Sequence, residues 1–343
     1  MRLETMTASN ISNPEERSLA NIALVSTGGT IEMVSDQGRI DIAKQHNPLP
    51  VQENVIPPFI SVEHTRFCSL PSPAISPGVM ADLCLVLENL AACGKYHGIV
   101  VTHGTDTLEE SAFLADIYLR STIPVVFTAA MRSQSEMGVD GPRNVKGALL
   151  TASNNEVHKL GVTVVLNDEI HSASRVTKTY TSNVSSFKSP GYGPLGFVDQ
   201  DRILLQRKPM RRIKLPRGKL KLDERVGLIR TAAGLGAREI RYCVDRGDRA
   251  LVVEALGRGN VPPEAAEAIQ YAVEKETIVC ITSRCYIGRV LGVYNYPGGG
   301  ADLERKGAIL AGDMQGHKLR LFLMASLGIG LNAENIRKLL ERF

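Results

Sequence analysis

The chain has 343 residues, of which 43% are hydrophobic and 22% are charged, and its formal net charge at pH 7 is +4. This is the composition of a soluble globular protein that can bury a sizeable core. No apolar run reaches the 18 or so residues that would cross a bilayer, and the first twenty residues lack the apolar stretch of a signal peptide. We therefore expect a cytoplasmic protein without a membrane partner, in which residues 1–20 form a disordered leader.

Strand and helix patterns alternate through the first two hundred residues. A helix is predicted after Ser76, which is suited to the N-cap position, with Pro77 at the first helical position. The alternation predicts a parallel sheet covered by helices on both faces, in a domain that spans residues 21–205. Its strands are expected at 21–27, 97–104, 124–131 and 161–168, and its helices at 76–93, 107–120 and 141–154.

A basic segment, residues 207–221, reads "RKPMRRIKLPRGKLK" and contains eight basic and no acidic residues. It lacks the aromatic side chains on which nucleic-acid bases stack, so we interpret it as part of a solvated linker, residues 206–224, and expect no nucleic-acid partner. A second, smaller α/β domain then follows over residues 225–343. Its strands are expected at 225–234, 250–260 and 277–284, and its helices at 237–247, 262–276, 318–328 and 332–343.

Three strands of the first domain end in polar or small-residue turns: "STGGT", "HGTDT" and "AAMRS". Open parallel sheets bind ligands beyond the carboxyl ends of their strands, so these turns should lie along one edge. The free N–H groups of the helix after "HGTDT" would favour a carboxylate or an oxyanion there. The groups brought together are Thr27, Thr30, Thr105, Asp106, Thr107 and the backbone of Ala129 and Ala130.

Each turn also has a simpler interpretation. "STGGT" could bind a phosphate, but it lacks the G-x-G-x-x-G spacing of a dinucleotide site. "GTDT" could cap the following helix, with Asp106 or Thr107 at the N-cap and Glu109 or Glu110 reaching back. We interpret His103 as a hydrogen-bonded structural residue and not as a base. The cysteines and histidines lack metal-ligand spacing, so no metal site is predicted.

The segment 167–196 is rich in small polar residues and is too long for a simple connection. Its "VTKT" motif places a single lysine, Lys178, between threonines. A threonine nucleophile needs a base, and a partly desolvated lysine can serve as one. The segment therefore predicts a functional loop that brings Lys178 to the threonine turns.

Together these motifs resemble the bacterial-type L-asparaginase/glutaminase family. The segments "TGGTI", "THGTDTLEES", "AAMRSQSEMGVDGPRN" and the run from Asn167 to Gly196 look like its signatures in the right order, over nearly the whole chain. The resemblance implies a large flavodoxin-like N-terminal domain and a smaller, Rossmann-like α/β C-terminal domain. It also implies hydrolysis of a small-molecule amide, L-asparagine or L-glutamine, to the acid and ammonia, without a cofactor or metal. Members assemble as homodimers or homotetramers in which a partner subunit completes each site.

The resemblance also assigns catalytic roles residue by residue. Thr30 of "GGTI" matches the primary nucleophile. Thr105 and Asp106 of "HGTDT" match the second threonine and its aspartate, and Lys178 matches the lysine that hydrogen-bonds both and accepts a proton.

Three further positions match substrate-binding residues. Ser72 in "LPSPAISP" resembles the serine that binds the substrate's α-carboxylate, while Asp106 should take its α-amino group. Ala130 resembles the residue whose backbone contacts the amide. Asn260 in "GRGN" resembles the asparagine that reaches across from the neighbouring subunit.

Two departures concern the first threonine. Many members place a tyrosine on the loop after "GGTI", where this chain has Arg39, and the glutamate often found after the "SR" strand is missing. Asp36 and His46 are other polar groups of that loop. We hypothesise that Tyr294 activates Thr30 and that Arg39 alters substrate choice.

Two other functions stay open at this point. The amidase subunit of a tRNA-dependent amidotransferase shares this fold but usually carries an extra N-terminal domain, whereas about twenty residues precede the first strand here. A catalytically weak amino-acid-binding protein is the other alternative. Pure binding would not require Lys178, which favours an amidohydrolase.

Overall fold

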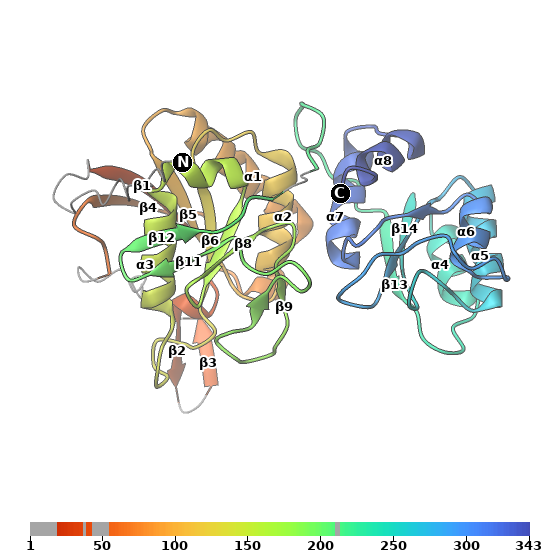
Figure 1. Ribbon diagram of the computed structural model, residues 1–343, viewed down its shortest axis with the longest axis horizontal. Helices are drawn as coiled ribbons and strands as arrows, with labels where there is room; N and C mark the ends of the chain where they lie inside the picture. Colours follow the sequence, from red (N-terminus) through yellow and green to blue (C-terminus); the bar gives the residue numbers. More distant parts are fainter. Residues whose placement is uncertain (1–18, 37–38, 43–54, 210–212) are drawn as a thin grey trace, which may run out of the picture.

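A mixed sheet of eight strands forms the centre of the N-terminal half of the chain (Figure 1). Its strands are β1 (Ala20–Ser26), β4 (Ile60–Arg66), β5 (Gly98–Thr102), β6 (Val125–Thr128), β7 (Thr163–Leu166), β8 (Glu169–Ser172), β11 (Gly196–Asp199) and β12 (Arg202–Leu205). The computed structural model describes residues 19–36, 39–42, 55–209 and 213–343, without the side chains of 34–36 and 39–42. The predicted leader therefore lies almost entirely outside the described residues.

The order of the strands is β12-β11-β8-β7-β6-β5-β1-β4. Neighbouring strands from β4 to β7 pair in parallel, whereas β8, β11 and β12 extend the sheet in antiparallel fashion. The sheet is therefore rich in parallel pairs, as the alternation predicted, with an antiparallel extension at one end that the alternation did not predict. The antiparallel strands lie in and after segment 167–196, whose polar sequence hides their pairing.

Helices cover both faces of this sheet, as predicted. α1 (Pro77–Ala92) and α2 (Leu108–Tyr118) pack on one face, and α3 (Gly141–Ala152) packs on the other. Successive apolar residues of β1 point to opposite faces, so that Val25 joins the core under α1 and α2 while Leu24 joins the core under α3. Ser76 caps α1 as predicted, because its Oγ accepts the Val79 N–H at 3.3 Å.

The C-terminal half contains a separate parallel sheet, β13-β14-β15-β16. These strands are β13 (Val226–Arg230), β14 (Ala250–Ala255), β15 (Ile278–Ser283) and β16 (Ile309–Leu310), and the helices are α4 (Arg238–Asp245), α5 (Pro263–Glu274), α6 (Gly300–Arg305), α7 (Gly316–Gly328) and α8 (Ala333–Leu340). α4, α5 and α6 pack on one face, and α7 covers the other. α7 also contacts α2, so it links the two halves of the molecule (Figure 1). Among the described helices, none is long and apolar enough to cross a membrane.

Several short elements complete the N-terminal half. They are two hairpins, β2 (Met33–Asp36) with β3 (Arg39–Ile42) and β9 (Thr177–Lys178) with β10 (Phe187–Lys188), and the 3-10 turns η2 (Thr30–Glu32), η3 (Ser72–Ala74) and η4 (Asn155–Leu160). The segment 167–196 is thus not a plain loop, since it contains β8 and the β9–β10 hairpin. Lys178 therefore sits on a paired strand, which restrains its backbone.

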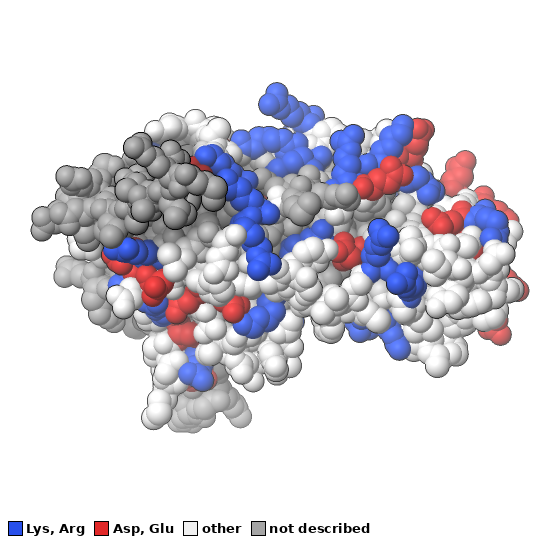
Figure 2. Space-filling model, in the orientation of Figure 1, with Lys and Arg blue, Asp and Glu red and all other residues white. Residues whose placement is uncertain are grey.

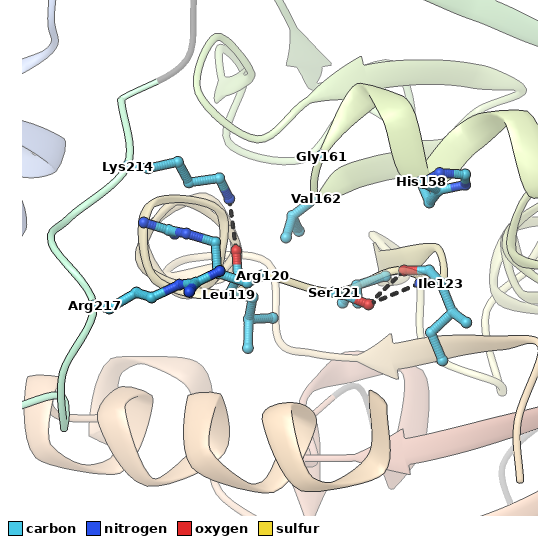
Figure 3. Close-up of a pocket in the computed structure, with 10 residues that line it drawn as sticks. Leu119, Arg120, Ser121, Ile123, His158, Gly161, Val162, Lys214 and Arg217 are labelled. Atoms are coloured by element: carbon cyan, nitrogen blue, oxygen red, sulfur yellow. Dashed lines mark hydrogen bonds between the residues drawn. The ribbon is translucent and has the colours of Figure 1, made fainter. Parts of the chain in front are cut away.

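The basic linker is held against the N-terminal half. Ile213, Leu215 and Leu220 are buried, so the expectation of a solvated segment is wrong for these residues. The Lys214 Nζ donates to the carbonyl of Leu119 at 2.8 Å, at the C-terminal end of α2 (Figure 3). Arginines and lysines suit that position because the last carbonyls of a helix carry partial negative charge.

Lys214 lines a cavity of 360 Å3 between the linker and the end of α2 (Figure 3). Two arginines, Arg120 and Arg217, also line this cavity. The Arg120 Nη1 donates to the Tyr118 carbonyl at 3.0 Å, and its Nη2 donates to Leu215 of the linker. Figure 2 shows lysine and arginine side chains at the top of the junction between the two halves. Lys214 of the linker and Arg120 at the end of α2 thus fasten the linker to this helix.

Candidate active site

Three strands of the large sheet end at the same level. Ser26 of β1 pairs with Thr102 of β5, and Thr102 pairs with Thr128 of β6. The next residues continue this ladder, because the Thr27 N–H donates to the Thr102 carbonyl at 3.1 Å and the His103 N–H donates to the Thr128 carbonyl at 2.9 Å. The three polar turns therefore leave from one edge of the sheet, as the sequence predicted.

Glycines let these turns approach each other backbone to backbone. Gly29 has a φ of 88°, in the left-handed region that side chains disfavour, and a Cβ there would lie 2.3 Å from the Cα of Gly104. A Cβ on Gly104 would in turn lie 2.7 Å from the Cβ of Ser72. The absence of both side chains brings the Thr30, Ser72 and Thr105 turns into contact.

Lys178 reaches this cluster from β9. Its Nζ donates to the Thr105 Oγ1 at 2.9 Å and to the Asp106 Oδ1 at 2.7 Å. Thr105 is 7% exposed, and the side chains of Lys178 and Asp106 are 16% and 55% exposed. The arrangement is a half-buried lysine between a buried hydroxyl and a carboxylate open to solvent. It can pass a proton between the hydroxyl and the amine while the carboxylate holds a cation.

The capping interpretation of "GTDT" is wrong. Thr107 occupies the N-cap position of α2, but its side chain accepts no N–H from the helix. Its Oγ1 instead donates to the Ser72 carbonyl at 2.8 Å, and the Ser72 Oγ accepts the Asp106 N–H at 3.1 Å. Glu109 turns away from the cap to accept the N–H of Lys178 at 3.1 Å. The polar cluster thus holds one turn against another.

His103 is a buried structural residue, in agreement with its interpretation from the sequence. Its Nδ1 lies 2.8 Å from the Gly104 carbonyl oxygen, and its Nε2 lies 2.9 Å from the Ser111 Oγ. Burial lowers the pKa of His103 to about 4, so the ring is neutral at pH 7. With both nitrogens occupied inside the protein, the imidazole supports the Gly104 turn.

The turn that carries Ala130 is held by two residues that the sequence analysis did not assign. The Asp140 carboxylate accepts the N–H groups of Met131 and Arg132, both at 3.0 Å. The Asn144 Nδ2 donates to the Ala129 carbonyl at 2.9 Å. Asp140 could have been noticed in the sequence, because it directly precedes the Gly-Pro start of a helix within a signature segment. Its hydrogen-bond partners, however, lie in the turn that precedes it and not in that helix. Ala130 itself is buried next to this support.

Asn260 and Tyr294 lie together, but away from the threonine turns. The Asn260 Oδ1 accepts the Gly300 N–H at 3.3 Å, and the Tyr294 carbonyl accepts the Ala301 N–H at 3.0 Å, both at the start of α6. Tyr294 is 43% exposed. In Figure 1, α6 lies at the far end of the C-terminal half, whereas the β2–β3 hairpin that follows Thr30 lies at the lower edge of the N-terminal half. A single chain therefore does not bring these two residues to Thr30.

The other groups proposed to act on Thr30 lie outside the described side chains, namely Arg39, Asp36 and His46. Glu32, which the sequence analysis did not single out, is buried two residues after Thr30. Burial raises the pKa of the Glu32 carboxyl, and within the described ranges its Oε1 accepts no hydrogen bond. A carboxyl group of raised pKa thus lies in the same 3-10 turn as Thr30.

Comparison with known proteins agrees with this geometry. Residues 21–211 match the family model "Asparaginase, N-terminal", and residues 225–340 match the "Glutaminase/Asparaginase C-terminal domain". The chain belongs to the asparaginase family. A probable L-asparaginase of Deinococcus radiodurans is 38% identical to it over 94% of this chain and 97% of the relative. An L-asparaginase of Bacillus licheniformis is 32% identical over 89% and 95%, and L-asparaginase 2 of Escherichia coli is 29% identical over 95% and 94%.

Family membership confirms the expectation of the fold class. An asparaginase with a large parallel-rich N-terminal sheet and a separate small parallel C-terminal sheet is what the alternating patterns and the signature segments together predicted. The matches also cover the whole of the described site, from the Thr30 turn to Asn260.

Proposed function

We propose that the protein hydrolyses L-asparagine to L-aspartate and ammonia. The observation that carries this proposal is the Lys178 Nζ, placed within hydrogen-bond distance of both the Thr105 hydroxyl and the Asp106 carboxylate. The names of the relatives, all L-asparaginases at 29% to 38% identity, support the same substrate. Neither the hydroxyl nor the amine is needed to bind an amino acid, whereas both are needed to move a proton.

In this proposal the reaction takes two steps. The Thr30 hydroxyl attacks the side-chain amide carbon, and ammonia leaves as an ester forms on Thr30. Water then attacks the ester, giving a proton to Lys178 through the Thr105 hydroxyl. The bond between the acyl carbon and the Thr30 oxygen breaks, that proton passes to the Thr30 oxygen to restore its hydroxyl, and L-aspartate leaves. The close packing of Gly29 against Gly104 supports a mechanism in which Thr30 is the nucleophile and Thr105 relays the proton, because these two threonines follow glycines of adjacent turns.

The substrate's charged groups find partners at the same edge. Asp106 is open to solvent and takes the α-ammonium group, while the hydroxyl proton of Ser72 is available for the α-carboxylate because its oxygen accepts the Asp106 N–H. The backbone at Ala130 contacts the amide. This orientation places the side-chain amide between the two threonines.

Ammonia release measured over a panel of amides tests the proposal. We expect turnover of L-asparagine, with L-glutamine or another small amide as the alternative substrate. Release from none of the panel would contradict the proposal and favour the binding protein. Tight tRNA binding that weakens steeply with salt would instead favour the amidotransferase subunit.

We propose that Thr30 is the acylated residue, that Tyr294 activates it and that Arg39 alters substrate choice. Trapping the intermediate at low pH and mapping it by mass spectrometry should place the acyl group on Thr30. Acylation of Thr105 alone would contradict the assignment. Arg39→Tyr should shift the ratio of asparagine turnover to alternative-amide turnover, and an unchanged ratio would remove Arg39 from the mechanism.

We also propose a homodimer or homotetramer in the cytoplasm. Asn260 and Tyr294 lie at the start of α6, in the other half of the molecule from the Thr30 turn, which supports an oligomer in which a second copy supplies both. A relative from Haemophilus influenzae is named a periplasmic L-asparaginase, so fractionation of the cells that make the protein tests the proposed location. We propose the division into residues 1–20, 21–205, 206–224 and 225–343, which is supported by two separate sheets and by family matches that end at residue 211 and resume at 225.

A further inference from the structure

The first turn of α7 carries two basic residues that reach from the C-terminal half into the N-terminal half. The His317 Nε2 lies 3.0 Å from the Glu109 Oε2, and the Lys318 Nζ lies 3.9 Å from the same oxygen. Glu109 belongs to the first turn of α2, three residues after Asp106, and its side chain is buried. The Glu109 carboxylate of the N-terminal half therefore forms ion pairs with two residues of the C-terminal half.

The other oxygen of Glu109 is used on the strand that carries Lys178. The Glu109 Oε1 accepts the backbone N–H of Lys178 at 3.1 Å. A charged acceptor makes this a stronger hydrogen bond than a neutral one would. Glu109 thus connects the α7 turn to the main chain of Lys178 itself.

Lys318 holds the residues that lead to Lys178. It is fully buried, and its Nζ donates to the carbonyls of Ala173 at 3.0 Å and Val176. These two hydrogen bonds and the Glu109 carboxylate, 3.9 Å away, compensate the charge of the ammonium group, which explains how a lysine can lie in the core. Segment 173–178 is therefore fixed at its start by Lys318 and at its end by Glu109.

We propose that Glu109, His317 and Lys318 are positioning residues that set the Lys178 Nζ against Thr105 and Asp106. In the described structure the Lys178 Nζ bonds to Thr105 and Asp106 and not to these three residues, so they act through the backbone of segment 173–178. This inference rests on the proposed function, in which Lys178 accepts a proton. It makes the docking of α7 on α2 a condition for turnover, and it gives the C-terminal half a role in the chemistry of its own chain.

The expected effect follows from the demands of proton transfer. Displacing a catalytic group by about 1 Å can lower a rate by about 10²-fold, whereas the Asp106 and Ser72 contacts with substrate would remain. A loss of positioning should therefore lower kcat and leave KM nearly unchanged. A purely structural role would instead reduce the amount of folded enzyme without changing either constant for the folded fraction.

Glu109→Gln tests the network with a residue of the same size. The amide can still accept the Lys178 N–H, but it replaces the oxygen that faces His317 and Lys318 with a donor. Glu110→Gln is the matched control, since it makes the same change one residue along α2, at a side chain with no hydrogen bond to segment 173–178 or α7 in the described structure. His317→Ala removes the donor to Glu109, and His317→Gln restores one without the ring.

Two measurements on the full-length protein decide the proposal. Steady-state ammonia release should show kcat roughly 10- to 100-fold lower in Glu109→Gln, with KM within about twofold and Glu110→Gln close to wild type. His317→Gln should recover most of the kcat lost in His317→Ala. Amide hydrogen exchange followed by mass spectrometry should be faster over residues 173–180 in Glu109→Gln and unchanged in Glu110→Gln.

A Glu109→Gln enzyme whose kcat stays within twofold of wild type would overturn the proposal, as would an equal loss in Glu110→Gln. The exchange measurement separates this failure from failure of the proposed function. If the wild-type protein released no ammonia from any amide, faster exchange over 173–180 in Glu109→Gln alone would still support the network, and unchanged exchange would reject it.

Discussion

Replacing Lys178 with methionine should lower turnover by at least about 10²-fold while the protein stays folded. The substitution keeps a long apolar side chain and removes the amino group whose Nζ lies 2.9 Å from the Thr105 Oγ1 and 2.7 Å from the Asp106 Oδ1. Loss of a positioned proton acceptor typically lowers a rate by about 10²- to 10⁴-fold. This corresponds to roughly 3 to 5 kcal/mol of transition-state stabilisation.

The cost to folding should be much smaller. Asp106 is more than half exposed, so water replaces the lysine as its partner, and an ion pair of this kind contributes about 1 kcal/mol or less to stability. Lys178→Met should therefore lose much more transition-state stabilisation than free energy of unfolding. Ammonia release gives the first, and urea unfolding gives the second.

Lys188→Met is a matched control for this experiment. Lys188 lies on β10, which pairs with β9, and its Nζ forms an ion pair with Glu169 at 3.0 Å. Its loss removes a lysine and an ion pair from the same hairpin without touching Thr105. Near-normal turnover in Lys178→Met, or an equal loss of turnover in Lys188→Met, would refute the assignment of Lys178.

Three other outcomes are expected. Gly29→Ala should destabilise the protein by roughly 1 to 3 kcal/mol in thermal or urea unfolding and lower turnover, because its Cβ would lie 2.3 Å from the Gly104 Cα; wild-type stability would mean that the turns are not closely packed. His103→Gln should flatten the loss of stability between pH 6.5 and 4, because the unfolded imidazole binds a proton below about pH 6.5 while the buried ring, with its pKa lowered to about 4, does not. The wild-type effect is roughly 3 kcal/mol at most, and equal slopes for both proteins in urea unfolding would argue against it. Light scattering should show at least two chains per particle, and Asn260→Ala should lower turnover; an active monomer would contradict both expectations.

Much of the scaffold was predictable from local patterns. The helices α1, α2 and α3 and the parallel strands between them follow from residues that alternate between buried strands and helix signals, and Ser76 marks the start of α1 by its own hydrogen-bonding capacity. The shared edge for the Thr30, Thr105 and Ala130 turns also followed from the sequence, because parallel strands must end on the same side. These features depend on residues close together in the chain, or on a rule that applies to every parallel sheet.

Only the tertiary structure decided how the polar residues are used. The capping pattern after Thr105 is present in the sequence, yet Thr107 and Glu109 are taken by Ser72 and Lys178, which lie 35 and 69 residues away from them. The antiparallel strands β8, β11 and β12 have only four residues each, so their pairing is set by the sheet they join. The α7 residues that face Glu109 come from the other half of the chain, more than 200 residues away. A hydrogen bond between such distant groups leaves no local pattern, because each side chain is chosen for a partner that only the folded chain brings within reach.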